Sequence, residues 1–84
     1  AEEQAALTEA NQLRKPGHPL SLSERVEAVA ALTARFPERA EFWSILGELR
    51  AEAGMNEEAR LALQRAVEKN PRYAEAWYWL GVVE

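Results

Sequence analysis

The 84-residue sequence contains no cysteine and no aspartate. Without cysteine, disulfide bonds, thiol catalysis and thiolate metal sites are excluded. The single histidine, His18, lies in a Pro- and Gly-containing stretch with no partners for a catalytic triad or a metal cluster. The neighbouring glutamates Glu2–Glu3 and Glu57–Glu58 point to different sides of a helix, so neither pair can face one substrate. We therefore expect no enzyme activity, no cofactor and no metal site.

Long apolar runs and a basic charge balance are also lacking. No run approaches the roughly 18 apolar residues that a membrane-spanning helix needs. The formal net charge is −4, from 14 acidic and 10 basic residues, which disfavours nonspecific binding to a polyanion. We therefore expect neither a membrane nor a nucleic acid as partner.

What the chain does have is an internal repeat. Ala, Glu, Leu and Arg dominate, and these residues favour helices. Six residues of the stretch 37–47 recur 34 positions later in the chain, which is the signature of a repeat architecture. The pairs are Pro37 and Pro71, Ala40 and Ala74, Glu41 and Glu75, Trp43 and Trp77, Leu46 and Leu80, and Gly47 and Gly81.

One period contains two helices with clear ends. Apolar residues at helical spacing predict a helix over 40–53, which Gly54 ends in a left-handed C-cap. Asn56 is suited to cap a second helix over 56–69, and Asn70-Pro71 stops that helix. Small residues at Gly47 and Ala59 predict that the two helices cross at close range, because a glycine inside a helix otherwise weakens it.

The first third of the sequence also predicts two helices, joined by the loop "KPGHPLSLS". Ser21 and Glu24 form a capping-box pattern at the start of the second of these helices. Leu13 and Arg25 occupy the positions at which the central pair has Gly47 and Ala59, so we expect the first pair to pack differently or more loosely. In total we expect five helices, alternating between a first (A) and a second (B) type.

The pattern Trp43-x2-Leu46-Gly47, followed by Ala59-x3-Leu63, Ala66 and Pro71, resembles the tetratricopeptide repeat (TPR). Residues 40–73 match a near-complete repeat, 74–84 match the first helix of another, and 6–39 form a degenerate copy. The resemblance implies an all-α fold, a right-handed α-solenoid of antiparallel helix pairs in a single TPR-like domain over 1–84.

In the TPR family the A helices line a concave surface that binds a peptide or protein, so the resemblance implies a protein–protein interaction module. Carried over by position, the groove residues are Glu41, Ser44, Ile45, Glu48, Glu52, Glu75, Tyr78, Trp79 and Val82. An acidic and aromatic lining favours a basic or apolar partner segment. Of the two C-terminal tryptophans, Trp77 is expected in the core, and Trp79 is expected to point into the groove.

Three alternatives stay open at this point. The chain could be a structural unit of a homo-oligomer, with a homodimer formed through the C-terminal helix. The elements Ala59-Arg60 and Arg65-Ala66 also resemble the half-a-TPR repeat of RNA-processing scaffolds. Because no second helix covers Leu80 and Val83, we favour a segment of a longer TPR protein over a chain closed by a second copy.

Overall fold

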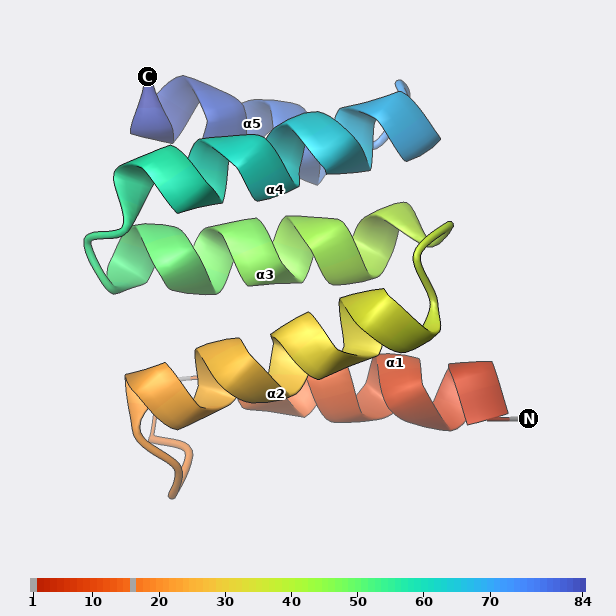
Figure 1. The fold of residues 1–84 in the computed structure, drawn as a ribbon, viewed down its shortest axis with the longest axis vertical. Coiled ribbons are helices and arrows are strands. Elements are labelled where there is room, and N and C mark those ends of the chain that lie inside the picture. The colour runs from red at the N-terminus through yellow and green to blue at the C-terminus, as the bar shows by residue number, and fades with distance from the viewer. Residues whose placement is uncertain (1, 16) are drawn as a thin grey trace.

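The computed structural model describes residues 2–15 and 17–84, which form five α-helices and no strand. The helices are α1 (Glu2–Leu13), α2 (Leu22–Arg35), α3 (Ala40–Glu52), α4 (Asn56–Lys69) and α5 (Ala74–Val83). Along the long axis of the molecule, α1 and α2 lie at one end, α3 in the middle and α4 and α5 at the other end, with α1 behind α2 and α5 behind α4 (Figure 1). The predicted all-α fold and the five helices are confirmed.

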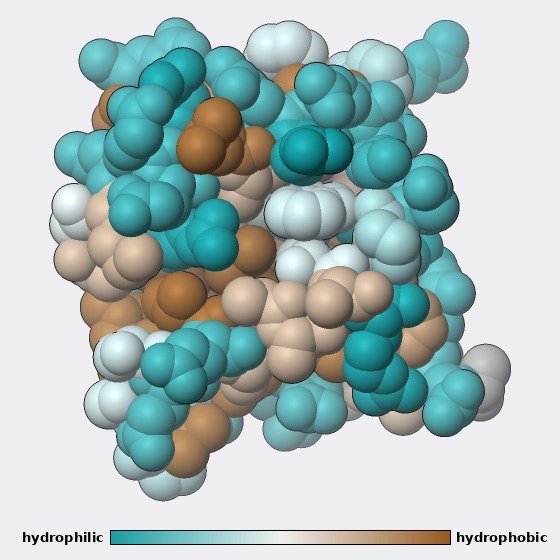
Figure 2. Space-filling view, in the orientation of Figure 1, coloured by the Kyte–Doolittle hydropathy of each residue, from teal (hydrophilic) through white to brown (hydrophobic). Residues whose placement is uncertain are grey.

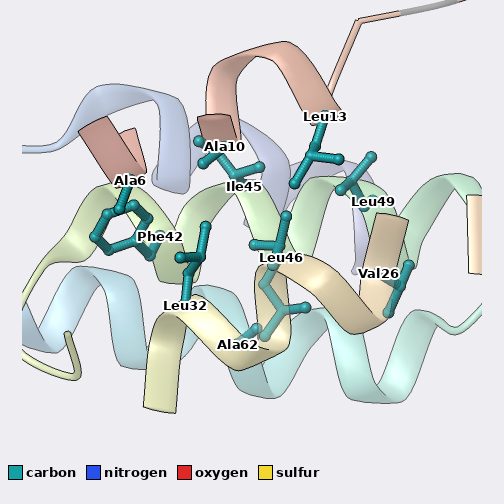
Figure 3. Packing of buried hydrophobic residues seen from close by; sticks show 11 residues of the cluster. Ala6, Ala10, Leu13, Val26, Leu32, Phe42, Ile45, Leu46, Leu49 and Ala62 are labelled. Carbon is teal, nitrogen blue, oxygen red and sulfur yellow. The ribbon is translucent and has the colours of Figure 1, made fainter. Parts of the chain in front are cut away.

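Helix α3 is the centre of the molecule, because it packs against each of the other four helices. Its apolar side chains Phe42, Ile45, Leu46 and Leu49 are all at most 1% exposed. Figure 3 shows α1 along one side of α3, with α2 and α4 on other sides. A helix surrounded in this way needs apolar residues on most of its circumference.

The turn between α3 and α4 forms as the sequence predicts at Gly54, but the cap of α4 differs. Gly54 has φ +78°, and the amide of Met55 donates to the carbonyl of Arg50 at 2.8 Å, which closes the helix end. The residue preceding α4 is Met55, with no side-chain cap bond, and Asn56 is already the first helical residue. The predicted Asn56 cap is therefore wrong, since the tight turn places Asn56 inside the first helical turn.

The close crossing of α3 and α4 is present at Gly47. A Cβ atom added there would contact the Cγ of Leu63 and lie 2.7 Å from its Cδ2 and 3.2 Å from the carbonyl oxygen of Ala59. Both Ala59 and Leu63 are fully buried. Only glycine allows the two backbones to approach this closely.

The first helix pair packs differently from the second, as Leu13 and Arg25 predict. The guanidinium of Arg25 donates to the carbonyl oxygen of Leu13 at 3.1 Å, so it caps the end of α1 instead of packing into a helix crossing. The capping box at Ser21 and Glu24 is formed in both directions. Its bonds to Ser21 lower the pKa of the Glu24 carboxyl.

The buried apolar side chains form two clusters. The larger joins α1, α2 and α3 with Ala62 of α4, and Figure 3 shows Ala10 beside Ile45 and Leu13 beside Leu49. The smaller cluster joins α3, α4 and α5 through Ala40, Leu63, Ala66, Ala76 and Leu80. Trp43 packs against both clusters, so it connects the two halves of the core.

The surface over α2, α3 and α4 is largely hydrophilic, with hydrophobic residues gathered between α2 and α4 (Figure 2). Over 2–15 and 17–84, none of the helices combines the length and the apolar character that crossing a bilayer requires.

Candidate protein-interaction surface

The predicted groove residues of the central helix α3 lie largely in the interior. Ser44 and Ile45 are 0% and 1% exposed, and Glu48 is 7% exposed. Glu41 and Glu52, nearer the two ends of α3, remain partly or fully exposed. In this chain the middle of α3 therefore offers no open surface, because α1 and α5 both pack against α3.

An ion-pair network joins the three A helices over this part of α3. Arg14, in the turn after α1, places Nη2 2.6 Å from the Oε1 of Glu48 and 2.9 Å from the Oε1 of Glu75 on α5. Burial raises the pKa of the Glu48 carboxyl, and the charges of Glu75 and Glu52 add to this, against the lowering effect of Arg14. Burial and the charge of Glu75 also raise the pKa of Tyr73. Arg14 is thus the cation that holds two carboxylates of different helices together.

A second network lies near the start of α3. The guanidinium of Arg39 contacts Glu3 of α1 and lies 3.1 Å from the Oε2 of Glu41. Burial alone would raise the pKa of Glu41, but the hydrogen bond to Arg39, a backbone hydrogen bond and the charge of Arg39 together outweigh burial and lower this pKa. Because Glu41 is already paired with Arg39, its carboxylate is less available for an ion pair with a partner protein.

The predicted groove residues of α5 are more accessible. Tyr78 is 66% exposed and Val82 is 54% exposed. Trp79 is half-buried against the smaller apolar cluster and makes an edge-to-face contact with Tyr78, with ring centroids 5.4 Å apart. The accessible apolar part of the predicted groove is thus concentrated on α5.

The expected burial of Trp77 needs correction. Trp77, expected in the core, is 52% exposed, whereas Trp79 packs partly against the core. The indole N–H of Trp77 nevertheless donates to the carbonyl of Pro71 at 2.7 Å, as that of Trp43 donates to Pro37 at 2.9 Å. The repeat therefore preserves this hydrogen bond of the ring, but among residues 2–15 and 17–84 no helix covers Trp77 in the way that both apolar clusters cover Trp43.

Sequence reasoning missed Arg14 as a part of this surface. The signal that could have found it is the repeat register, because Arg14 and Glu48 are 34 residues apart and so occupy equivalent positions of adjacent repeats. Equivalent positions of neighbouring repeats face each other, and these two carry opposite charges. Tyr73 was missed as well, since it lies in the turn before α5.

The candidate interaction surface is shallow. No pocket is present among residues 2–15 and 17–84. Within the same residues, no group of three or more side chains has the arrangement of a metal site. Aromatic side chains such as Tyr78, which is 66% exposed, are enriched in protein–protein interfaces, whereas carboxylates are depleted there.

Comparison with known proteins agrees with this architecture. A family model described as TPR repeat matches residues 37–83, which is more than half of the chain. The matched region begins just before α3 and includes α3, α4 and nearly all of α5. No curated protein and no solved structure matches the chain.

Proposed function

Since the chain belongs to the tetratricopeptide-repeat family, we propose that it acts as a protein–protein interaction module that captures a partner segment on the concave side of its A helices. The partner contacts would be made mainly by the groove residues of α5, Tyr78 and Val82, flanked by Trp79 and Glu75. A rigid helical array costs little ordering entropy when a segment docks on it.

The observation that carries this proposal is the contrast between equivalent positions of α3 and α5. Tyr78 and Val82 correspond to Ser44 and Glu48, 34 residues earlier. Ser44 and Glu48 are buried, but Tyr78 and Val82 are 66% and 54% exposed. Exposed aromatic side chains with few rotatable bonds are frequent energetic centres of protein interfaces.

The charge of the surface favours a basic and apolar segment. Glu52 is exposed, and Glu75 keeps part of its side chain in solvent beside Tyr78. Arg14 lies between Glu48 and Glu75, so the local balance is two carboxylates to one cation. A Lys or Arg of the partner would therefore add a favourable charge pair at this edge, with a salt-dependent association rate.

The proposal can be tested by selecting peptides from a random library on the immobilised 84-residue chain. We expect a consensus of basic residues around an aliphatic or aromatic anchor. The dissociation constant of the best peptide should rise at least tenfold with Tyr78→Ser, since loss of an interface hot spot costs roughly 2 kcal/mol or more.

Leu61→Ser provides the matched control, because Leu61 is 52% exposed on α4 and lies outside the predicted groove. That variant should bind the selected peptide as the wild type does. An acidic consensus, or binding that Tyr78→Ser leaves unchanged, would contradict the proposed groove.

Self-association is a second candidate function, favoured by the uncovered apolar side chains of α5. In that case the chain would build a homodimer through α5 and select no foreign peptide. Sedimentation equilibrium over a range of concentrations distinguishes peptide capture from self-association. If the molecular mass remains that of the monomer at every concentration, self-association is contradicted.

A further inference from the structure

Arg14 connects the exposed residues of α5 to the interior of the molecule. Its Nη2 donates a hydrogen bond to the Oε1 of Glu48 at 2.6 Å. The same nitrogen lies 2.9 Å from the Oε1 of Glu75 on α5, but this contact is an ion pair without the alignment of a hydrogen bond. The oriented bond of Arg14 is therefore made to Glu48, and the carboxylate of Glu75 keeps the capacity to accept from a further donor.

The two carboxylates that Arg14 contacts differ in accessibility. The side chain of Glu48 is only 10% exposed, whereas that of Glu75 is 38% exposed. The Oε1 of Glu75 is shielded from solvent, so Oε2 is the oxygen that a partner can reach. Glu75 is thus the carboxylate of this network that is open to a second molecule.

Negative charge is in excess around Arg14. Two carboxylates, Glu48 and Glu75, share one guanidinium. Burial raises the pKa of the nearby Tyr73 phenol, and the charges of Glu75 and Glu41 raise it further, against the lowering effect of Arg14. A cation supplied by a partner would balance this excess.

The geometry of α5 sets how far this cation lies from the apolar contacts. Glu75, Tyr78 and Val82 share one side of α5, because residues three, four and seven positions apart in a helix point the same way. A side chain seated between Tyr78 and Val82 lies about 7.5 Å along the helix axis from Glu75, at a rise of roughly 1.5 Å per residue. In an extended segment, two residues advance by about 6.6 Å and place both side chains on the same face. A basic and an apolar residue with one residue between them therefore match this side of α5.

We propose that Arg14 is a positioning residue of the groove, which fixes Glu75 so that Oε2 binds the cation of an extended partner segment whose basic and apolar residues are separated by one residue. A carboxylate that is already held in place loses less side-chain entropy on binding than a free one. This role rests on the proposed function, since it concerns the same groove, and it adds the spacing of the partner's two anchor residues.

The test uses two capped peptides of the same composition, each with one arginine and one phenylalanine among glycines and serines. In the first peptide one residue separates the arginine from the phenylalanine. In the second they are adjacent, so an extended backbone points them to opposite faces. NMR titration of the isotope-labelled 84-residue chain gives both dissociation constants. We expect the first peptide to bind roughly threefold more tightly, the gain of one well-placed charge pair, and call the ratio of the two constants the spacing preference.

Variants of the two charged residues test the proposal. Glu75→Gln should bring the spacing preference close to one, because the amide has no charge. Glu68→Gln is the matched control and should keep the preference, because Glu68 is exposed on α4, outside the groove. Arg14→Gln should lower the preference at least twofold, since Glu75 is no longer held, and Arg14→Lys should restore most of it.

The ratio distinguishes positioning from a purely structural role of Arg14. If Arg14 only stabilised the fold, its loss would weaken both peptides equally and leave the spacing preference unchanged. The loss of its positive charge also acts on both peptides alike. A preference that survives Glu75→Gln, or one that Arg14→Gln leaves unchanged, would overturn the proposal.

Tyr78→Ser tests the groove separately, because it should weaken both peptides by removing their shared apolar contact. If both peptides bind equally well to the wild type and Tyr78→Ser weakens them, the groove is supported and the positioning role of Arg14 is refuted. If neither peptide gives saturable shifts, both the groove and the positioning role are refuted.

Discussion

Adding one methyl group at Gly47 should destabilise the fold, whereas the same change at Gly81 should stabilise it. Both glycines lie inside helices and in the same register of the repeat. Replacing a helical glycine by alanine contributes about 0.5–1 kcal/mol through backbone entropy. At Gly81 nothing opposes this gain, because the new Cβ meets no atom within 4 Å.

At Gly47 the new Cβ would contact Leu63 and approach the carbonyl oxygen of Ala59 to 3.2 Å. Leu63 is fully buried, so it cannot move aside without disturbing its neighbours. Overpacking of this kind costs about 1–3 kcal/mol. We therefore expect Gly47→Ala to be less stable than Gly81→Ala by about 1–3 kcal/mol, or roughly 4–24 °C in melting temperature for a domain of this size.

Urea unfolding of the two variants and the wild type, followed by circular dichroism at low temperature, measures this difference. A double-mutant cycle with Leu63→Ala should show coupling to Gly47→Ala, because removing the leucine relieves the contact, and no coupling to Gly81→Ala. If Gly47→Ala proves as stable as Gly81→Ala, the close crossing of α3 and α4 is refuted.

Three further predictions concern the cap, the tryptophans and the buried carboxylate. Ser21→Ala should cost about 1 kcal/mol in thermal unfolding, since it removes the capping box of α2. Trp43→Ala should cost about 3–5 kcal/mol and Trp77→Ala much less, because only the first ring packs against both clusters; equal losses in urea unfolding would contradict this. Burial raises the pKa of the Glu48 carboxyl in the folded protein, so its protonated form contributes stability at pH values below the ordinary pKa of 4.5. This contribution is lost as the pH rises through the raised pKa. The variant Glu48→Gln should therefore become more stable relative to the wild type as the pH rises above 4.5, and a relative gain at lower pH would contradict the raised pKa.

Much of the helical layout could be read from local signals in the sequence. The 34-residue repeat, the glycine turn at Gly54 and the capping pattern at Ser21 depend on residues close together in the chain, so they could be predicted one helix at a time. Gly47 and Ala59 could be recognised because a glycine inside a helix calls for a close neighbour.

The accessibility of the candidate surface was decided by the tertiary structure. The repeat register predicts Ser44 and Glu48 as groove residues of α3, but it could not show that packing and Arg14 would cover them. Nor could it show that Trp77 stays exposed although Trp43 is covered. A repeat in the sequence assigns equivalent positions to each helix, but burial depends on which neighbouring helices are present in space, and that differs between the centre of the stack and its end.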